Sequence, residues 1–341
     1  MNGATIRDVA RAADVSVATV SRTLNGLESV AATTRDRVLR VAGELDYVPN
    51  SGARALSTRR TDTIGVLLPD LHGEFFSELI RGIDLAARAR GLHLLLSSSH
   101  GDPAEAAAAL RAMRSRVDSI ILMLPHAGED DLLGSGTGSV PMVFLGRGGC
   151  NRGHASFEID NHSGALAITE HLLALGRNRI AFVAGPPDNI EARERLRGYR
   201  AAIAAAGARA WVVDGDFSEQ SGSAAARAFI GGDRPDAIFC ANDMMAIGCL
   251  EVLRGAGIRI PEDIALAGYD DIPIARYVSP ALTTAAVPIA DIGRQALECC
   301  ADAIAGQSAR PRTFQPQLVI RASTTGKTFD ATIPNLKRGI A

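Results

Sequence analysis

Residues 4–56 constrain the fold most strongly, because three short stretches of this segment place apolar residues at helical spacing. The first stretch has such residues at positions i, i+3, i+4 and i+7, namely Ile6, Val9, Ala10 and Ala13. Residues 14–16 interrupt the pattern, with Ser16 placed to cap a second helix over residues 17–24 that Asn25 and Gly26 end. Two short helices joined by a tight turn predict a helix-turn-helix.

A third helix is predicted from Thr33 or Thr34 to Leu45. Its apolar stripe is expected to consist of Val38, Leu39, Ala42 and Leu45. This stripe would close a three-helix core, which Val20 and Leu24 of the second helix also face. An Ala-rich helical pair with a purely structural role shows the same periodicity, so spacing alone does not establish a DNA-binding module.

In a helix-turn-helix, the first residues of the second helix meet base edges in the major groove. The pattern therefore predicts that Val17, Ala18 and Arg22 face DNA. Arg22 can fork onto the O6 and N7 atoms of a guanine, whereas the two apolar side chains can contact a thymine methyl group. Phosphate contacts are expected from three hydroxyl side chains: Ser16, Thr19 and Ser21.

The motifs of this segment resemble the lactose and galactose repressor family. They are Thr5-Ile6-Arg7-Asp8-Val9-Ala10, Val15-Ser16, Ala18-Thr19-Val20-Ser21-Arg22, Leu24-Asn25-Gly26, Tyr47-Val48-Pro49-Asn50 and Ala53-Arg54-Ala55-Leu56. The resemblance continues to about Ser323 and implies further DNA contacts by Thr5, Asn25, Tyr47, Asn50, Ala53 and Arg54. One departure is Val30-Ala31-Ala32, where the family usually has Ser in the second place, which weakens the start of the third helix.

Residues 50–57 resemble the hinge helix of that family. The resemblance implies that this helix forms on operator DNA and that Leu56 enters the central minor-groove step from both subunits. Unstacking such a step costs a few kcal/mol, which the contacts of the bent DNA offset. Because so short a helix is marginal alone, its ordering can couple the DNA to the rest of the chain.

Charge separates the first 60 residues from the remainder. They carry nine Arg and six acidic residues, so their net charge is +3, whereas the whole chain carries −2 and the remainder therefore −5. A basic head suits a nucleic-acid partner, and the distribution of charge matters more than its sum. The length of 341 residues and the hydrophobic content of 47% predict two to three folded domains.

The composition also predicts a cytoplasmic protein without a membrane segment. The amino terminus lacks a signal-peptide pattern, and no run of about 18 apolar residues occurs. The five cysteines are odd in number and lack Cys-x-x-Cys spacing, which favours reduced core thiols over a metal or redox site. No cofactor or metal is expected.

From Thr61 the pattern becomes an alternation of short apolar runs and amphipathic helices, which predicts parallel α/β sheets. Strands are predicted at 63–68, 92–97, 119–124 and 142–145, with helices at 76–90 and 104–114. A second set consists of helices at 161–175, 193–206, 221–230 and 244–256, with strands at 180–184, 210–213, 237–240 and 264–267. Residues 290–305 and 317–320 are expected to return to the first lobe.

The predicted fold is thus a three-helix helix-turn-helix domain (1–49), a hinge helix and linker (50–60) and a two-lobed α/β sensor (61–325) of the type seen in periplasmic binding proteins. Lobe one is expected to comprise about 61–160 and 290–325, and lobe two about 161–289. Residues 326–341 show little periodicity and are expected to form a loose tail.

Ligands of open α/β sheets bind outside the carboxyl ends of the strands, so the cleft between the lobes is the expected site. The candidates at those ends are Phe75, Phe76, Arg147, Asp160, Arg195, Phe217, Asn242 and Asp270. The resemblance implies effector contacts for five of them: Phe75, Arg195, Phe217, Asn242 and Asp270. Such a set suits a polyol, since aromatic faces cover C–H surfaces and polar side chains bind hydroxyls.

Structural alternatives exist for these candidates. The two aromatics Phe75 and Phe217 could be plain core, Asn242 could cap a helix, and Asp270 with Asp271 could form an ordinary turn. An α/β enzyme is disfavoured because no dinucleotide fingerprint, Walker lysine, His-Glu-x-x-His or nucleophile elbow occurs. A periplasmic solute-binding protein is disfavoured by the DNA-binding head.

We therefore expect a ligand-responsive transcription factor, most simply a repressor of a catabolic operon controlled by a sugar or sugar derivative. One recognition helix reads few base pairs, so a homodimer on double-stranded palindromic operator DNA is expected. No heptad repeat follows Ser323, which disfavours a coiled-coil tetramer.

Overall fold

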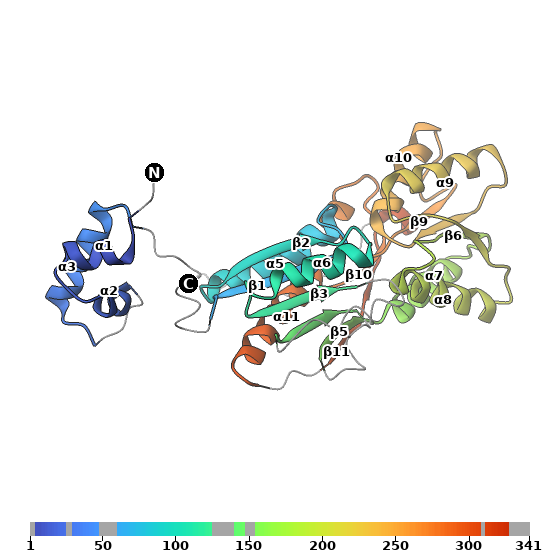
Figure 1. Cartoon of the computed structure of the whole chain (residues 1–341). Coiled ribbons are helices and arrows are strands. Elements are labelled where there is room, and N and C mark those ends of the chain that lie inside the picture. Colours follow the sequence, from blue (N-terminus) through green and yellow to red (C-terminus); the bar gives the residue numbers. More distant parts are fainter. Residues whose placement is uncertain are drawn as a thin grey trace, which may run out of the picture. The chain divides into compact units, whose positions relative to one another are not determined.

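The computed structural model describes residues 4–24, 29–47, 60–124, 140–146, 154–307 and 311–326. The chain divides into two compact units, Met1–Thr61 and Asp62–Ala341, which are described separately (Figure 1). The hinge residues Asn50, Ala53, Arg54 and Leu56 lie outside the described residues, as do Asn25, Arg147 and nearly all of the expected tail.

The described residues of the first unit form three helices, α1 (Ile6–Ala12), α2 (Val17–Leu24) and α3 (Ala32–Glu44), as predicted (Figure 1). Thr5 precedes α1. The Asp8 carboxylate accepts hydrogen bonds from the backbone N–H of Thr5 at 3.0 Å and from the Thr5 hydroxyl at 2.6 Å. Small apolar side chains form the core: Val9, Ala10, Ala13, Val20, Val38, Val41 and Ala42. Leu24 packs against this core as a half-buried side chain.

The predicted apolar stripe of the third helix is half wrong. Leu39 and Leu45 are 49% and 37% exposed, whereas Val38, Val41 and Ala42 are buried. Positions i, i+3 and i+4 lie on one face of a helix, and Leu39 is rotated by one residue from that face. Residue type favoured the leucines, but the two valines and the alanine let the three short helices approach closely.

The second unit begins with a parallel sheet in the order β11-β5-β4-β3-β1-β2. Its strands are β1 (Thr63–Leu68), β2 (His93–Ser98), β3 (Ser119–Met123), β4 (Met142–Leu145), β5 (Ala155–Ile159) and β11 (Arg312–Phe314). Sequence analysis predicted the first four of these but missed β5 and β11. We call this sheet and the helices that pack on it lobe one.

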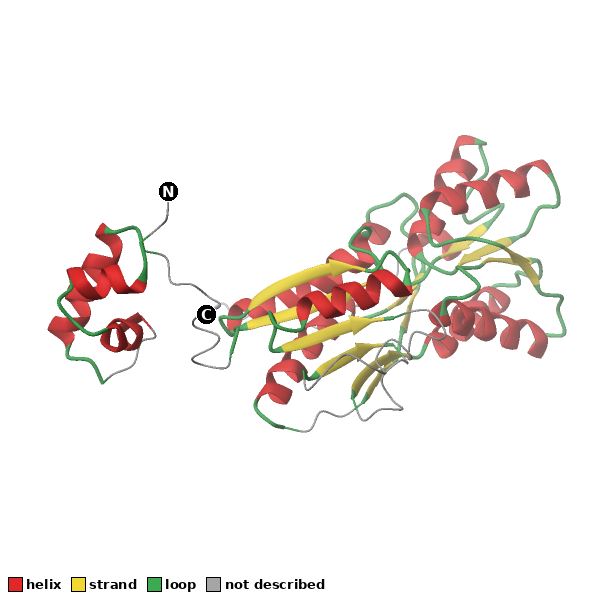
Figure 2. Cartoon of the chain, in the orientation of Figure 1, coloured by secondary structure: helices red, strands yellow, loops and turns green. Residues whose placement is uncertain are grey.

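Helices cover both faces of the lobe-one sheet (Figure 2). They are α5 (Glu74–Ala89), α6 (Pro103–Met113) and α11 (Ile289–Ile304). Ile64 and Val66 of β1 belong to the same apolar cluster as α5 and α11, whereas Leu67 belongs to the cluster with α6. Alternate side chains of a strand point to opposite faces, so a strand buried on both faces reads as one continuous apolar run.

Lobe two is built on a second parallel sheet, in the order β7-β6-β8-β9. Its strands are β6 (Ile180–Val183), β7 (Trp211–Val213), β8 (Ala237–Cys240) and β9 (Ala265–Ala267). The helix pair α7 (Asn161–Ala174) and α8 (Ile190–Ala205) packs on one side, and the pair α9 (Glu219–Gly231) and α10 (Asp243–Gly255) on the other (Figure 1).

The chain crosses between the lobes near its end, and one prediction is corrected there. Strand β12 (Gln317–Val319) does not return to the lobe-one sheet but pairs antiparallel with β10 (Thr284–Ala286). The following helix α12 (Ala322–Thr325) is anchored to lobe two, where the Ser323 hydroxyl donates to the Leu266 carbonyl at 2.6 Å. The short 3-10 helix Pro273–Arg276 precedes β10.

Four cysteines in the described part of the chain are free and buried: Cys240, Cys249, Cys299 and Cys300. The prediction of reduced core thiols is confirmed for these four, and Cys150 lies outside the described residues. The described segments hold no helix with the length and apolar character needed to cross a bilayer, and no cluster of three metal-ligating side chains.

Candidate functional site

Helix α2 presents the predicted recognition residues on its exposed side. The Ser16 hydroxyl oxygen accepts from the Thr19 N–H at 3.1 Å, which confirms Ser16 as the cap of this helix. Val17 is 42% exposed, and Ala18 and Arg22 are also exposed. Val20 and Thr23 on the opposite side are buried. The helix therefore leaves an apolar pair and one guanidinium accessible, as base reading requires.

Other residues predicted to contact DNA are hydrogen-bonded within the chain or partly buried. The Thr5 hydroxyl bonds to Asp8, Ser21 is half-buried, and Tyr47 is a half-buried side chain packed on the three-helix core. Thr19 shares a hydrogen bond of 2.9 Å with the Ser16 hydroxyl, so these two hydroxyls organise the start of α2.

A pocket in the second unit is lined by residues from both lobes and has a volume of about 140 Å³. It brings together six of the eight predicted effector residues: Phe75, Phe76, Arg195, Phe217, Asn242 and Asp270. They lie at the first turn of α5, within α8, before α9, at the cap of α10 and after β9. The strands of a parallel sheet end at one edge, which explains why residues so far apart in sequence meet there.

One of the other two candidates lies away from the pocket, and one lies outside the described residues. Asp160 does not line the pocket, and its side chain instead caps α7 by accepting from the Ser163 N–H at 3.0 Å. Burial raises the pKa of the Asp160 carboxyl, but hydrogen bonds from Ser163 and Gln315 and the charge of His162 together lower it. Arg147 lies outside the described residues.

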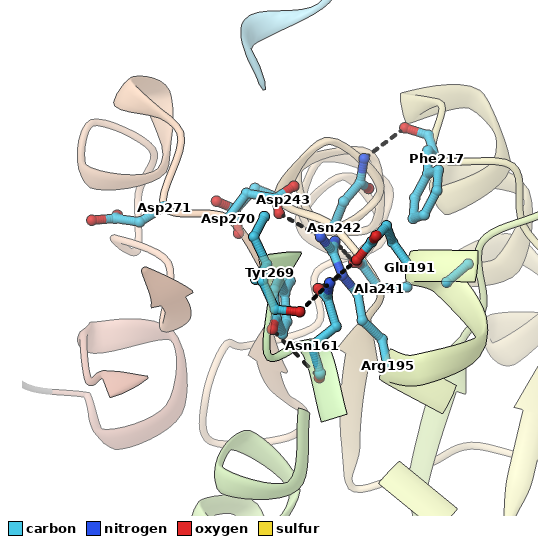
Figure 3. A network of polar contacts seen from close by, with 12 residues as sticks. Asn161, Glu191, Arg195, Phe217, Ala241, Asn242, Asp243, Tyr269, Asp270 and Asp271 are labelled. Carbon is cyan, nitrogen blue, oxygen red and sulfur yellow. Dashed lines mark hydrogen bonds and ion pairs between the residues drawn. The ribbon is translucent and has the colours of Figure 1, made fainter. Parts of the chain in front are cut away.

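Arg195 is the centre of a network of polar contacts at the pocket (Figure 3). Its Nε donates to the Asn161 Oδ1 at 2.7 Å, and its Nη1 donates to the Ala241 carbonyl at 2.6 Å. Its Nη2 lies 2.9 Å from the Asp270 Oδ1, and only 6% of each of these two side chains is exposed. The guanidinium carbon lies 3.9 Å from the centre of the Tyr269 ring, a cation–π contact.

Asp270 lies beside this arginine, and Asp243 and Asp271 lie near Asp270 (Figure 3). Burial raises the pKa of Asp270 to about 6, although the Arg195 guanidinium lowers it. Burial, and then the Asp270 charge, raise the pKa of Asp243 well above its ordinary value. Asp271 lies 2.6 Å from the Arg321 guanidinium. Asp270 and Asp271 have φ of +107° and +55°, so tertiary contacts hold both in a conformation that L residues rarely adopt.

The edge of the pocket near α10 is also held in place. Asn242 accepts from the Met245 N–H at 2.9 Å, and its amide donates to the Phe217 carbonyl at 2.9 Å. Asn242 thus has the capping role of the structural alternative while it also lines the pocket. Phe217 has φ of +71°, and its ring fits only because residue 185 is glycine, where a Cβ would lie 2.4 Å from the ring.

Sequence reasoning missed several residues of this site. The buried Asn161 joins Arg195 to Glu191, because its amide donates to the Glu191 carboxylate. Asn189 and Glu191 line the pocket at the start of α8. In the sequence, Asn189 indicates only a helix N-cap, and Glu191 indicates only a favourable interaction with the helix dipole. The apolar wall was missed beyond Phe75 and Phe76, because its members are indistinguishable from core residues in sequence.

Comparison with known proteins bears on both units. The family model "Bacterial regulatory proteins, lacI family" matches residues 5–50, and that of the periplasmic binding protein-like domain matches residues 169–324. The HTH-type transcriptional repressor PurR of Photobacterium profundum is 36% identical over 94% of this chain and 98% of its own length. The HTH-type transcriptional regulator CelR of Thermobifida fusca is 36% identical over the same shares.

Solved structures match over nearly the whole chain. The Lac repressor dimer bound to operator and the anti-inducer ONPF has a TM-score of 0.84 and 28% identity, covering 95% of this chain and 99% of the other. The complex of the transcriptional regulator CelR with cellobiose has a TM-score of 0.69 and 33% identity, covering 94% of this chain and 99% of the other.

Proposed function

Because this chain belongs to the LacI family of bacterial regulatory proteins, a family of DNA-binding transcriptional regulators, we propose that it is a repressor controlled by a small effector bound between its lobes. The observation that carries the proposal is the interlobe pocket, which is lined by the buried Arg195 and Asp270 of lobe two and by Phe75 of lobe one. Burying two charges costs desolvation energy, and buried charged groups that line a cleft are typical of functional sites.

The proposed DNA target is a double-stranded palindromic operator read by a homodimer. Arg22 would read a base edge, and the exposed Val17 and Ala18 would contact thymine methyl groups. A similar protein, the Lac repressor, is a dimer in its operator complex. Two recognition helices related by a two-fold axis give far greater specificity than one. A DNA-bound regulator of this kind acts in the cytoplasm.

The effector is proposed to be a sugar or sugar derivative. A similar regulator is known in complex with cellobiose, and another LacI family regulator, from Enterococcus faecium, has bound ribose. Aromatic side chains on both lobes, Phe75 and Phe217, can cover the C–H faces of a sugar ring. The polar groups beside Arg195 can bind its hydroxyls.

The proposed switch is a change in the relative arrangement of the two lobes. Arg195 and Asp270 belong to lobe two and Phe75 belongs to lobe one, so a ligand held by all three favours one lobe arrangement over another. Lobe one is continuous with residues 50–60, the proposed hinge with the proposed minor-groove residue Leu56. A lobe rotation would change the spacing of two such hinges in a dimer.

A two-stage experiment tests this function. A thermal-shift screen of sugars, sugar derivatives and nucleobases first identifies compounds that raise the melting temperature of the full chain, because a ligand selective for the folded state stabilises it. The affinity for an operator selected from random duplexes is then measured with and without each compound. A compound that shifts both melting and operator affinity supports the proposal, and stabilising compounds without effect on operator affinity would contradict it.

A further inference from the structure

We propose that Arg321 is a positioning residue of the effector pocket, although it is not among the described residues that line it. Through Asp271, Arg321 fixes the turn that presents Asp270 to a ligand. This role rests on the proposed effector function of the pocket and adds a residue from outside its lining. Because Arg321 lies just after β12, the same ion pair joins the pocket to the strands that connect the two lobes.

The turn after β9 directs two consecutive aspartates to different sides. The Asp270 Oδ1 lies 2.9 Å from the Arg195 Nη2, whereas the Asp271 side chain points away from Arg195 (Figure 3). The φ angles of Asp270 and Asp271 are +107° and +55°, which L residues adopt only where surrounding contacts hold them. The direction of the Asp270 carboxylate therefore depends on what holds both residues of the turn.

Backbone contacts to the crossover strand β10 and its continuation hold the first of the two residues. The Asp270 N–H donates to the Ala285 carbonyl at 2.9 Å, and the Val287 N–H donates to the Asp270 carbonyl at 3.1 Å. The backbone of Asp271 is held less closely, since its N–H lies 3.3 Å from the Thr284 Oγ1. The side chain of Asp271 makes the closer contact.

The Asp271 carboxylate lies near two arginines of very different exposure. Its Oδ1 is 2.6 Å from the Arg321 Nη2, and the side chains of Arg321 and Asp271 are 10% and 13% exposed. Its Oδ2 is 3.5 Å from the Nη2 of Arg276, whose side chain is 53% exposed. Water screens the exposed pair much more than the buried one, so Arg321 holds Asp271 and Arg276 adds little.

Arg321 is itself fixed in place at the start of α12. Its Nη1 donates to the Leu282 carbonyl at 2.8 Å, and its backbone N–H donates to the Thr283 Oγ1 at 2.8 Å. Both of these partners precede β10, which leads into α11 of lobe one, and Arg321 follows β12, which comes from β11 of lobe one. A ligand that moves Asp270 therefore acts on the segments that connect the lobes.

Titration of the Asp270 carboxyl group tests this role without a ligand. The full chain is labelled with carbon-13 at its aspartate carboxyl carbons, and the Asp270 signal is identified by its absence from Asp270→Asn. Burial raises the pKa of Asp270 from 3.8 to about 6, and its charged neighbours are Arg195 and Asp243. A carboxyl group that leaves this buried position loses the effect of burial, so its pKa falls.

The decisive variant is Arg321→Met, because its two possible effects have opposite signs. Loss of a positive charge alone raises the pKa of Asp270, whereas release of the turn lowers it toward 3.8. We expect a fall of at least about one unit, which is a tenfold change in proton affinity, and a partial return in Arg321→Lys. The matched control is Arg276→Met, which removes the exposed partner of the same carboxylate and should change the pKa little.

The double variant Arg321→Met/Asp271→Asn decides the question if Arg321→Met unfolds. It replaces a buried ion pair by neutral side chains of similar size, which proteins often tolerate. It also removes charges of opposite sign, so their direct effects on the pKa of Asp270 largely cancel, and a fall reports release of the turn.

An Asp270 pKa that stays unchanged or rises in either folded Arg321 variant would overturn the proposed role. An equal fall in Arg276→Met would also overturn it, because the buried pair would then have no special part. Failure of every screened compound to alter operator affinity would refute the proposed function, but these titrations would still establish what positions Asp270.

Discussion

The recognition helix α2 and the interlobe pocket use their functional side chains in opposite ways. Val17, Ala18 and Arg22 are exposed on a helix whose other side packs in the core, so they contribute little to the stability of the fold. Arg195 and Asp270 are buried and hydrogen-bonded or ion-paired with neighbouring elements. Function and stability are therefore separable in the head but coupled in the sensor.

The largest effect is expected from Arg195→Ala. Its loss leaves the Asp270 charge buried without its partner and removes the bonds to Asn161 and Ala241, at about 3–5 kcal/mol of unfolding free energy. Denaturant unfolding of the full chain, followed through the sensor transition, measures this. The matched control is Arg197→Ala on the same helix, where an exposed pair with Glu194 is worth at most about 1 kcal/mol. Equal losses in the two variants would remove the contrast between buried and exposed arginines.

A smaller, purely functional effect is expected from Arg22→Ala. Affinity for the selected operator should fall by about 1–3 kcal/mol, with little change on random DNA, because one base contact is lost. Melting should be unchanged, since the side chain is exposed. Arg11→Ala, also exposed but on α1, is the control. Equal weakening on both DNAs would show that Arg22 contacts phosphate rather than a base.

The same contrast explains what the sequence could predict. Periodicity and strand-end position gave the three helices of the head, both parallel sheets and six pocket residues, because local spacing reports which face a side chain occupies. Local spacing could not predict strand β11, because its three residues form a strand only by pairing with β5 in the folded chain. Nor could it distinguish Met123 or Ile292 as pocket walls from core, or detect the bridge from Asn161 to Glu191.

A third effect concerns the pH dependence of stability. The pKa of Asp270 is raised by burial from 3.8 to about 6 in the folded chain. A raised folded pKa gives stability that is fully present below the unfolded value and is lost as the pH rises through the folded value. The stability of the sensor should therefore fall more steeply between pH 3.8 and about 6 in the wild type than in Asp270→Asn. Urea unfolding at stepped pH measures the difference, with Glu170→Gln expected to follow the wild type; parallel curves for wild type and Asp270→Asn would mean that this carboxyl is solvated.

The separation of reading from sensing is tested most directly by one titration. Operator affinity is measured over a range of effector concentration for the wild type, Arg22→Ala and Asp270→Asn. We predict that Asp270→Asn retains the operator affinity of the ligand-free wild type but no longer responds to effector, whereas Arg22→Ala binds operator weakly while effector still raises its melting temperature. An Asp270→Asn variant that responds at the wild-type effector concentration would contradict the assignment of the interlobe pocket as the sensing site.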